Sequence, residues 1–106
     1  MIKRFCTLSL LLALTTSAYA TENWRDKAVE LAKLDPKVRD ALWSQDISFW
    51  IGVDDDGTNR SGFAEYFCFV LRDAGRPDGE FVAITLWDHA SILNNSPKQL
   101  GKAICQ

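Results

Sequence analysis

The acidic segment at residues 54–60 contains the side chains of this chain that are best suited to hold a metal ion. Its oxygen donors are Asp54, Asp55, Asp56 and Asn59. A calcium ion takes about 6–8 such ligands, but the EF-hand spacing fails here. With Gly57 at the sixth position, the first position is Gly52 and the twelfth is Phe63, which supply no side-chain oxygen.

Two other interpretations of this segment remain open. It is either a solvated, turn-rich loop or a negatively charged finger that meets a basic cleft on a protein partner, where opposite charge speeds and orients the encounter. We take the second as the working hypothesis. It names as partner-binding residues Asp54, Asp55, Asp56, Asn59 and Arg60.

His89 is the only histidine of the chain. It follows the end of a predicted strand, which is where the sites of α/β folds tend to lie. Catalysis would also need a nucleophile, and no serine lies in a G-x-S-x-G or S-x-x-K motif. Carboxylate pairs such as Glu65 with Asp88 have no diagnostic spacing. We therefore expect no catalytic residue, no metal site and no cofactor.

The large aromatic side chains are numerous for so small a core. Trp50 stands between Ser48 and Gly52 on one face of a predicted strand, whereas the other face is purely apolar. Tryptophan is a favoured anchor of protein interfaces, so we add Trp50 to the partner-binding residues. The alternative is that a helix covers this face and makes Trp50 part of the core.

The first 20 residues have the three parts of an export signal. Lys3 and Arg4 form the positive region, residues 8–14 form an apolar run too short to span a bilayer, and residues 18–20 offer a small-x-small cleavage site. We expect cleavage after Ala20, no membrane anchor afterwards, and one domain at residues 21–106. The predicted location is the periplasm or the outside of the cell.

Cleavage would leave Cys68 and Cys105 as the remaining cysteines. In an oxidising compartment two cysteines most simply pair, and closing this loop stabilises the fold by about 3–4 kcal/mol in the chain-entropy model. Two widely spaced cysteines and one histidine lack the spacing of a zinc site. We therefore predict a disulfide between them.

Net charge limits the classes of partner. The whole chain carries a formal charge of −2, and cleavage removes Lys3 and Arg4 but no acid, which makes it −4. Nucleic acids and anionic membranes need lysine and arginine to neutralise phosphates. The charge therefore disfavours both and permits a basic protein partner. It does not indicate the oligomeric state.

The elements that must position these residues begin with helices. Asn23 is a suitable N-cap for a helix whose apolar face is formed by Trp24, Ala28, Leu31 and Ala32. Asp35 and Pro36 predict a second helix, continued by Val38, Ala41 and Leu42. The N-terminal third is therefore expected to be helical.

A strand, a helix and a second strand should follow. Residues 47–53 alternate in polarity, as strands do. Residues 62–74 have apolar spacing typical of a helix, capped by Ser61 and ended by Gly75, although a strand stays open there. Residues 81–87 form an apolar run that predicts a strand covered on both faces.

The last segment, residues 97–105, fits a helix or a strand, with Leu100, Ala103 and Ile104 pointing inward. Asp88 is expected to cap a short turn before it. The expected fold class is α+β, close to α/β. It is one small domain with N-terminal helices, a β-α-β unit and a C-terminal segment tied by the disulfide.

These features together favour a small periplasmic binding protein without catalysis. One form of it is an immunity protein or inhibitor that neutralises an enzyme attacking the envelope, as the type VI secretion immunity proteins do. Two alternatives remain. An envelope accessory or chaperone-like component would expose an apolar patch instead of an acidic finger, and a small hydrolase or calcium-dependent protein would need a polar pocket around His89.

Overall fold

The computed structural model describes residues 23–106. The predicted leader at residues 1–20 therefore lies outside the described residues. The elements are α2 (Trp24–Lys33), β1 (Val38–Gln45), β2 (Ser48–Val53), α3 (Ser61–Ala74), β3 (Val82–Asp88), α4 (His89–Leu93) and β4 (Gln99–Cys105). The α+β class and the single small domain are confirmed.

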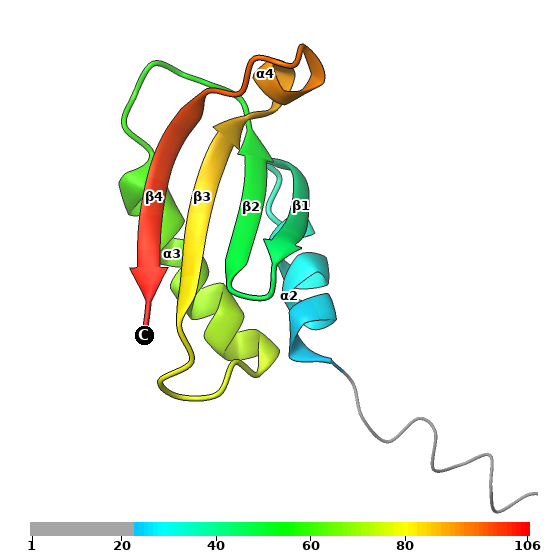
Figure 1. Cartoon of the computed structure of the whole chain (residues 1–106), viewed down its shortest axis with the longest axis vertical. Coiled ribbons are helices and arrows are strands. Elements are labelled where there is room, and N and C mark those ends of the chain that lie inside the picture. Colours follow the sequence, from blue (N-terminus) through cyan, green and yellow to red (C-terminus); the bar gives the residue numbers. More distant parts are fainter. Residues whose placement is uncertain (1–22) are drawn as a thin grey trace, which may run out of the picture.

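The strands form one four-stranded sheet in the order β1-β2-β3-β4. The central pair, β2 and β3, is parallel, and each outer pair is antiparallel. Because a parallel pair needs a crossover, α3 connects β2 to β3 and completes the predicted β-α-β unit. Figure 1 shows α2 and α3 on the same side of the sheet, with α4 at the end where β2 and β3 finish.

The core lies between the sheet and these two helices. Strands alternate their side chains between two faces, and in β2 and β3 one set is fully buried. This set consists of Phe49, Ile51, Val53, Val82, Ile84 and Leu86. Ala28 and Ala32 of α2 and Phe67 and Leu71 of α3 pack on it from the other side.

The N-cap residue of α2 makes a side-chain hydrogen bond to the helix, whereas the N-cap residue of α3, Arg60, makes none. The Asn23 side chain accepts a hydrogen bond of 2.8 Å from the backbone N–H of Arg25, as predicted for α2. Helix α3 begins at Ser61 itself, so Ser61 is not its cap; the Asn59 side chain accepts from the Ser61 N–H at 2.8 Å. Gly75 ends α3 with φ 110°, a left-handed conformation that suits glycine.

The predicted second helix is wrong, because its residues form β1 instead. Asp35 does accept a hydrogen bond of 2.9 Å from the Lys37 N–H, but this closes a single turn that leads into a strand. An irregularity in the pairing between Val38 and Asp40 then shifts the register against β2. Val38 and Ala41 therefore reach the same side at a spacing that mimics a helix.

The C-terminal segment is a strand, β4, which settles the open choice between helix and strand. Ala103 and Cys105 point into the core, whereas Ile104 is 48% exposed, so its predicted inward position is wrong. Leu100 is half-buried at the edge of the core.

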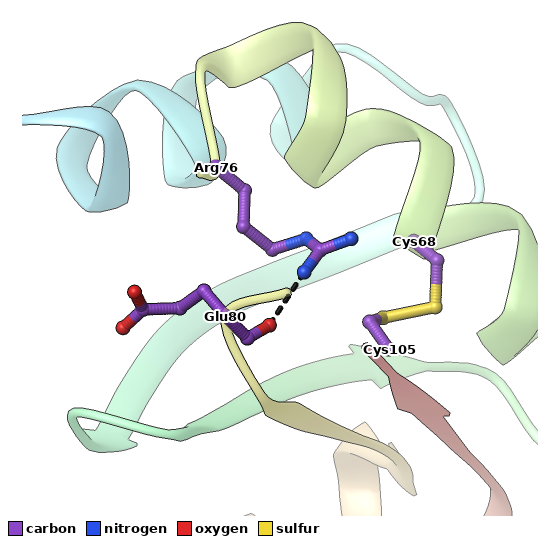
Figure 2. The surroundings of a disulfide bond; sticks show 4 residues. All are labelled: Cys68, Arg76, Glu80 and Cys105. Atoms are coloured by element: carbon purple, nitrogen blue, oxygen red, sulfur yellow. Dashed lines mark hydrogen bonds between the residues drawn. A yellow bond between two sulfur atoms is a disulfide. The ribbon is translucent and has the colours of Figure 1, made fainter. Parts of the chain in front are cut away.

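The predicted disulfide is present and fastens β4 to α3. Cys68 and Cys105 are joined with their Cα atoms 5.5 Å apart, and Figure 2 shows the bond running from the helix to the strand end. Nearby, the Arg76 guanidinium donates a hydrogen bond to the carbonyl oxygen of Glu80, which closes the loop between α3 and β3. The C-terminal strand is thus held on the helical layer by a covalent bond.

Within residues 23–106, every helix is too short or too polar to cross a lipid bilayer.

Candidate functional site

One face of the sheet lacks a covering helix along most of its length. Figure 1 shows this face toward the viewer, with only α4 lying over one end. We call this surface the open face. Side chains alternate between the two faces along each strand, so the residues next to the buried set belong to the open face. They include Leu42, Trp50, Ala83, Thr85, Trp87 and Ile104. The predicted cover of β3 on both faces holds only in part, because on the open face Thr85 is buried whereas Ala83 and Trp87 are half-buried.

Trp50 and Trp87 form an aromatic pair at the centre of the open face. In the parallel register Trp50 lies opposite Thr85, and Trp87 lies opposite Gly52. Each ring therefore stands beside a smaller residue, and the two rings meet diagonally, with centroids 5.0 Å apart and planes inclined at 58°. Of the two structural alternatives for Trp50, the face without a covering helix is the one observed.

A cavity of about 170 Å³ lies between this pair and α4. Leu42, Trp50 and Trp87 from the strands and Ile92 and Leu93 from α4 give it apolar walls. Leu93 is 71% exposed and Leu42 is 45% exposed, so both also form the rim that faces solvent. The open face is thus hollowed where a short helix projects over it.

The floor of this cavity depends on Gly52. A Cβ atom at that position would lie 3.0 Å from Nδ1 of His89, which is tighter than ordinary van der Waals contact. His89, the first residue of α4, therefore packs directly on the backbone of β2. The imidazole thus holds α4 close to the sheet.

The predicted acidic finger is present as a loop, but its carboxylates are paired within the molecule. Arg39 donates to both carboxylate oxygens of Asp54, at 3.2 and 2.9 Å. The Lys98 ammonium donates to Asp55 at 2.7 Å. Asp56 accepts from the Thr58 hydroxyl at 2.6 Å and lies 3.5 Å from the Arg60 guanidinium.

These contacts lower the pKa of each aspartate. The hydrogen bond from Arg39 lowers the pKa of Asp54, and the one from Lys98 lowers the pKa of Asp55. The pKa of Asp56 is lowered mainly by the Thr58 hydroxyl and then by the Thr58 N–H. All three stay charged near neutral pH, but with cations of the same chain beside them.

The two other residues predicted in the loop have structural contacts of their own. The side-chain oxygen of Asn59 accepts a hydrogen bond from the Ser61 N–H. Arg60 donates to the Asp54 carbonyl oxygen at 3.2 Å, and its side chain is only 13% exposed. The loop is therefore bonded both within itself and to Arg39 and Lys98, and none of its residues lines the cavity beside Trp50.

Residues of the types that perform metal or nucleophilic chemistry do not converge in the described part of the chain. Among residues 23–106 no three histidine, cysteine, aspartate or glutamate side chains come together as metal ligands. Ser91, two residues from His89, donates its hydroxyl to the Asp88 carbonyl oxygen at 2.7 Å and accepts from the Lys98 N–H. The Ser91 hydroxyl therefore links α4 to the segment just before β4.

A second apolar surface lies on the helical layer, on the opposite side of the molecule. Leu34, Tyr66 and Phe69 are 76%, 47% and 54% exposed. A groove of about 410 Å³ runs beside Leu34 and Tyr66, with Asp35 and Asp73 at its borders. We call this the helical surface; it lacks a tryptophan pair and gives a matched contrast to the open face.

The sequence prediction found Trp50 but missed the other members of the site. Ala83 and Thr85 both precede Trp87 on its face of β3, and Ser48 and Gly52 lie on either side of Trp50 on β2. The repeated pattern of one large ring beside two smaller residues was the signal that could have paired them. Leu42 could not be found, because its strand was predicted as a helix.

Comparisons with protein-family models, with curated proteins and with solved structures found no match for this chain.

Proposed function

We propose that the chain is an exported, non-catalytic binding protein whose open face binds a protein partner. The observation that carries this proposal is the Trp50–Trp87 pair on a sheet face that α2 and α3 leave uncovered. Tryptophan in a partly enclosed, central position is the residue type that most often dominates binding energy at interfaces. Apolar neighbours such as Leu42 and Leu93 extend this centre outward.

The location is part of the proposal. A leader at residues 1–20 would carry the chain out of the cytoplasm, and the bond between Cys68 and Cys105 suits an oxidising compartment. In that setting the narrower role is inhibition: the domain covers and neutralises an enzyme that acts on the envelope, as an immunity protein does.

The mode of binding differs from the acidic-finger hypothesis. Asp54, Asp55 and Asp56 already have Arg39, Lys98 and Arg60 beside them, so they offer little uncompensated charge to a basic cleft. The open face offers apolar area instead, which is the feature expected of an accessory or chaperone-like component. That role is therefore the second candidate, and it would use the same surface.

The test begins with the purified exported protein immobilised and exposed to periplasmic extract. The captured protein is identified by mass spectrometry and purified, and its affinity is measured for three forms of the domain: wild type, Trp50→Ser and Leu34→Ser. We expect Trp50→Ser to weaken binding by about 30-fold, as loss of a central tryptophan does. Leu34→Ser, on the helical surface, should leave affinity within twofold.

The opposite pattern, with binding lost in Leu34→Ser and kept in Trp50→Ser, would refute the open face as the binding site. The two candidate roles are then separated by the enzymatic activity of the captured partner. Loss of that activity on addition of one equivalent of the domain supports inhibition. Unchanged activity supports the accessory role.

A further inference from the structure

The cavity between the Trp50–Trp87 pair and α4 indicates what kind of segment the partner presents. We propose that it is an anchor pocket for one aliphatic side chain, of leucine or methionine size, on a partner segment that carries lysine or arginine next to it. This inference rests on the proposed function and specifies the chemistry of its binding site.

The size of the cavity sets the first limit. Sites for cofactors and other small molecules usually measure about 300–1,000 Å³, whereas this one measures about 170 Å³. A cavity of about 150 Å³ accommodates a single benzene-sized group. The anchor pocket therefore fits one side chain, which is how a hot-spot residue inserts at a protein interface.

The walls set the second limit. Trp50, Trp87 and Leu42 on the strands and Leu93 on α4 offer carbon surface. The indole N–H of Trp87 is buried without a partner, so it is not available to a ligand from outside. Most of the wall is therefore carbon surface, on which a polar side chain would lose its hydration, and an aliphatic one is favoured.

Charge at the rim sets the third limit. Asp40 is the only acidic side chain among the residues that line the cavity. Within the chain, its carboxylate accepts a hydrogen bond of 2.9 Å from the Ala41 N–H and lies 3.3 Å from the Lys33 ammonium, and the Lys33 and Asp40 side chains are both about half exposed. The Lys33–Asp40 contact is an ion pair without a hydrogen bond, unlike the contacts that hold Asp54 and Asp55, so Asp40 can share its charge with a lysine or arginine of the partner. An acidic residue at that place would be repelled.

The test uses short synthetic peptides, acetylated and amidated, with the central sequence Ala-Lys-Leu-Ala. Binding is followed by NMR through the indole N–H signals of Trp50 and Trp87 in the full exported protein. We expect saturable shifts of these two signals. Replacing the peptide leucine by alanine should weaken binding about tenfold, and replacing its lysine by glutamate should weaken it about two- to fivefold.

Two variants of the protein separate the two parts of the inference. Asp40→Asn should remove the preference for lysine over glutamate and leave the preference for leucine over alanine. Leu93→Ser, at an exposed position on the pocket wall, should reduce the leucine preference without unfolding the domain. Leu34→Ser on the helical surface is the control and should change neither.

Absence of any saturable shift of the two indole signals would overturn the anchor pocket, and three other outcomes would also contradict the inference. Peptides that shift the two indole signals with no preference for leucine or lysine would overturn the anchor pocket and leave the open face as a binding site. Peptides that shift only Tyr66 and Phe69 would contradict both the pocket and the proposed function. A dimer in sedimentation that Trp50→Ser dissociates would show that a second copy occupies the open face, and would overturn the inference.

Discussion

Trp87 lies directly opposite Gly52 in the parallel pairing of β2 and β3, and its ring packs against Trp50 because Gly52 has no side chain. The same glycine receives the imidazole of His89. One small residue thus determines both the aromatic pair and the position of α4.

Two neighbouring residues of β2 should differ sharply in their contribution to stability. Phe49 is fully buried between the sheet and the helices, and Trp50 is half-buried on the open face. We expect Phe49→Ala to lower the free energy of unfolding by about 3–5 kcal/mol, and Trp50→Ala by about 1–2 kcal/mol. Urea unfolding followed by circular dichroism measures both. Equal losses would mean that the open face is covered in solution.

Two glycines should respond in opposite directions to alanine. A Cβ atom at Gly101 would overlap the backbone of Arg60 and Ser61, where the start of α3 lies on β4. We expect Gly101→Ala to lower the free energy of unfolding by about 1–3 kcal/mol. Gly62, in the first turn of α3, has open space around it, and Gly62→Ala should raise that free energy by about 0.5–1 kcal/mol. Thermal melts measure both variants. A shift of the two melting midpoints in the same direction would contradict this packing.

The disulfide should supply a large share of stability. It closes a loop with a sequence separation of 37 residues, which is worth about 3–4 kcal/mol in the chain-entropy model. We expect Cys68→Ser with Cys105→Ser to lower the free energy of unfolding by that amount. Adding a reductant should shift the wild-type midpoint and leave the double variant unchanged. A wild-type midpoint that ignores the reductant would show that the bond is not formed.

The acidic loop should make stability depend on pH in the acidic range. Asp54, Asp55 and Asp56 have folded-state pKa values below their ordinary value of 3.8, so near that pH the unfolded chain binds more protons than the folded one. The free energy of unfolding therefore falls as pH drops through about 4 toward the lowered values. These pairs are solvent-exposed, and their total effect should be small.

The measurement is the free energy of unfolding between pH 2 and pH 6 for the wild type and for a variant with all three aspartates changed to asparagine. We expect a shallower pH slope in the variant. Added salt at 1 M should reduce the difference by screening the ion pairs. Identical slopes in the two proteins would show that the loop contacts seen here do not form in solution.

The sequence indicated the central β-α-β unit because its signals are local. Alternation in β2, the helical spacing of α3 and the left-handed Gly75 at its end each follow from a few neighbouring residues. Strand β1 was missed for a specific reason. The irregularity between Val38 and Asp40 breaks its alternation, and the turn at Asp35 imitates a helix start.

The candidate site depends on contacts that sequence patterns do not contain. The carboxylates of the loop looked available because Arg39 and Lys98, which neutralise Asp54 and Asp55, come from β1 and from the segment before β4. Trp50 could be selected from its small neighbours alone. Its partner Trp87 required the parallel register between two strands that are separated by a whole helix.

The most direct test of the open face is photocrosslinking inside the cell. Photoreactive benzoylphenylalanine replaces Leu42 in one variant and Phe69, on the helical surface, in the other; both positions are about half exposed, at 45% and 54%. We predict a defined crosslinked product from position 42 and none from position 69. A product from position 69 alone would contradict this prediction.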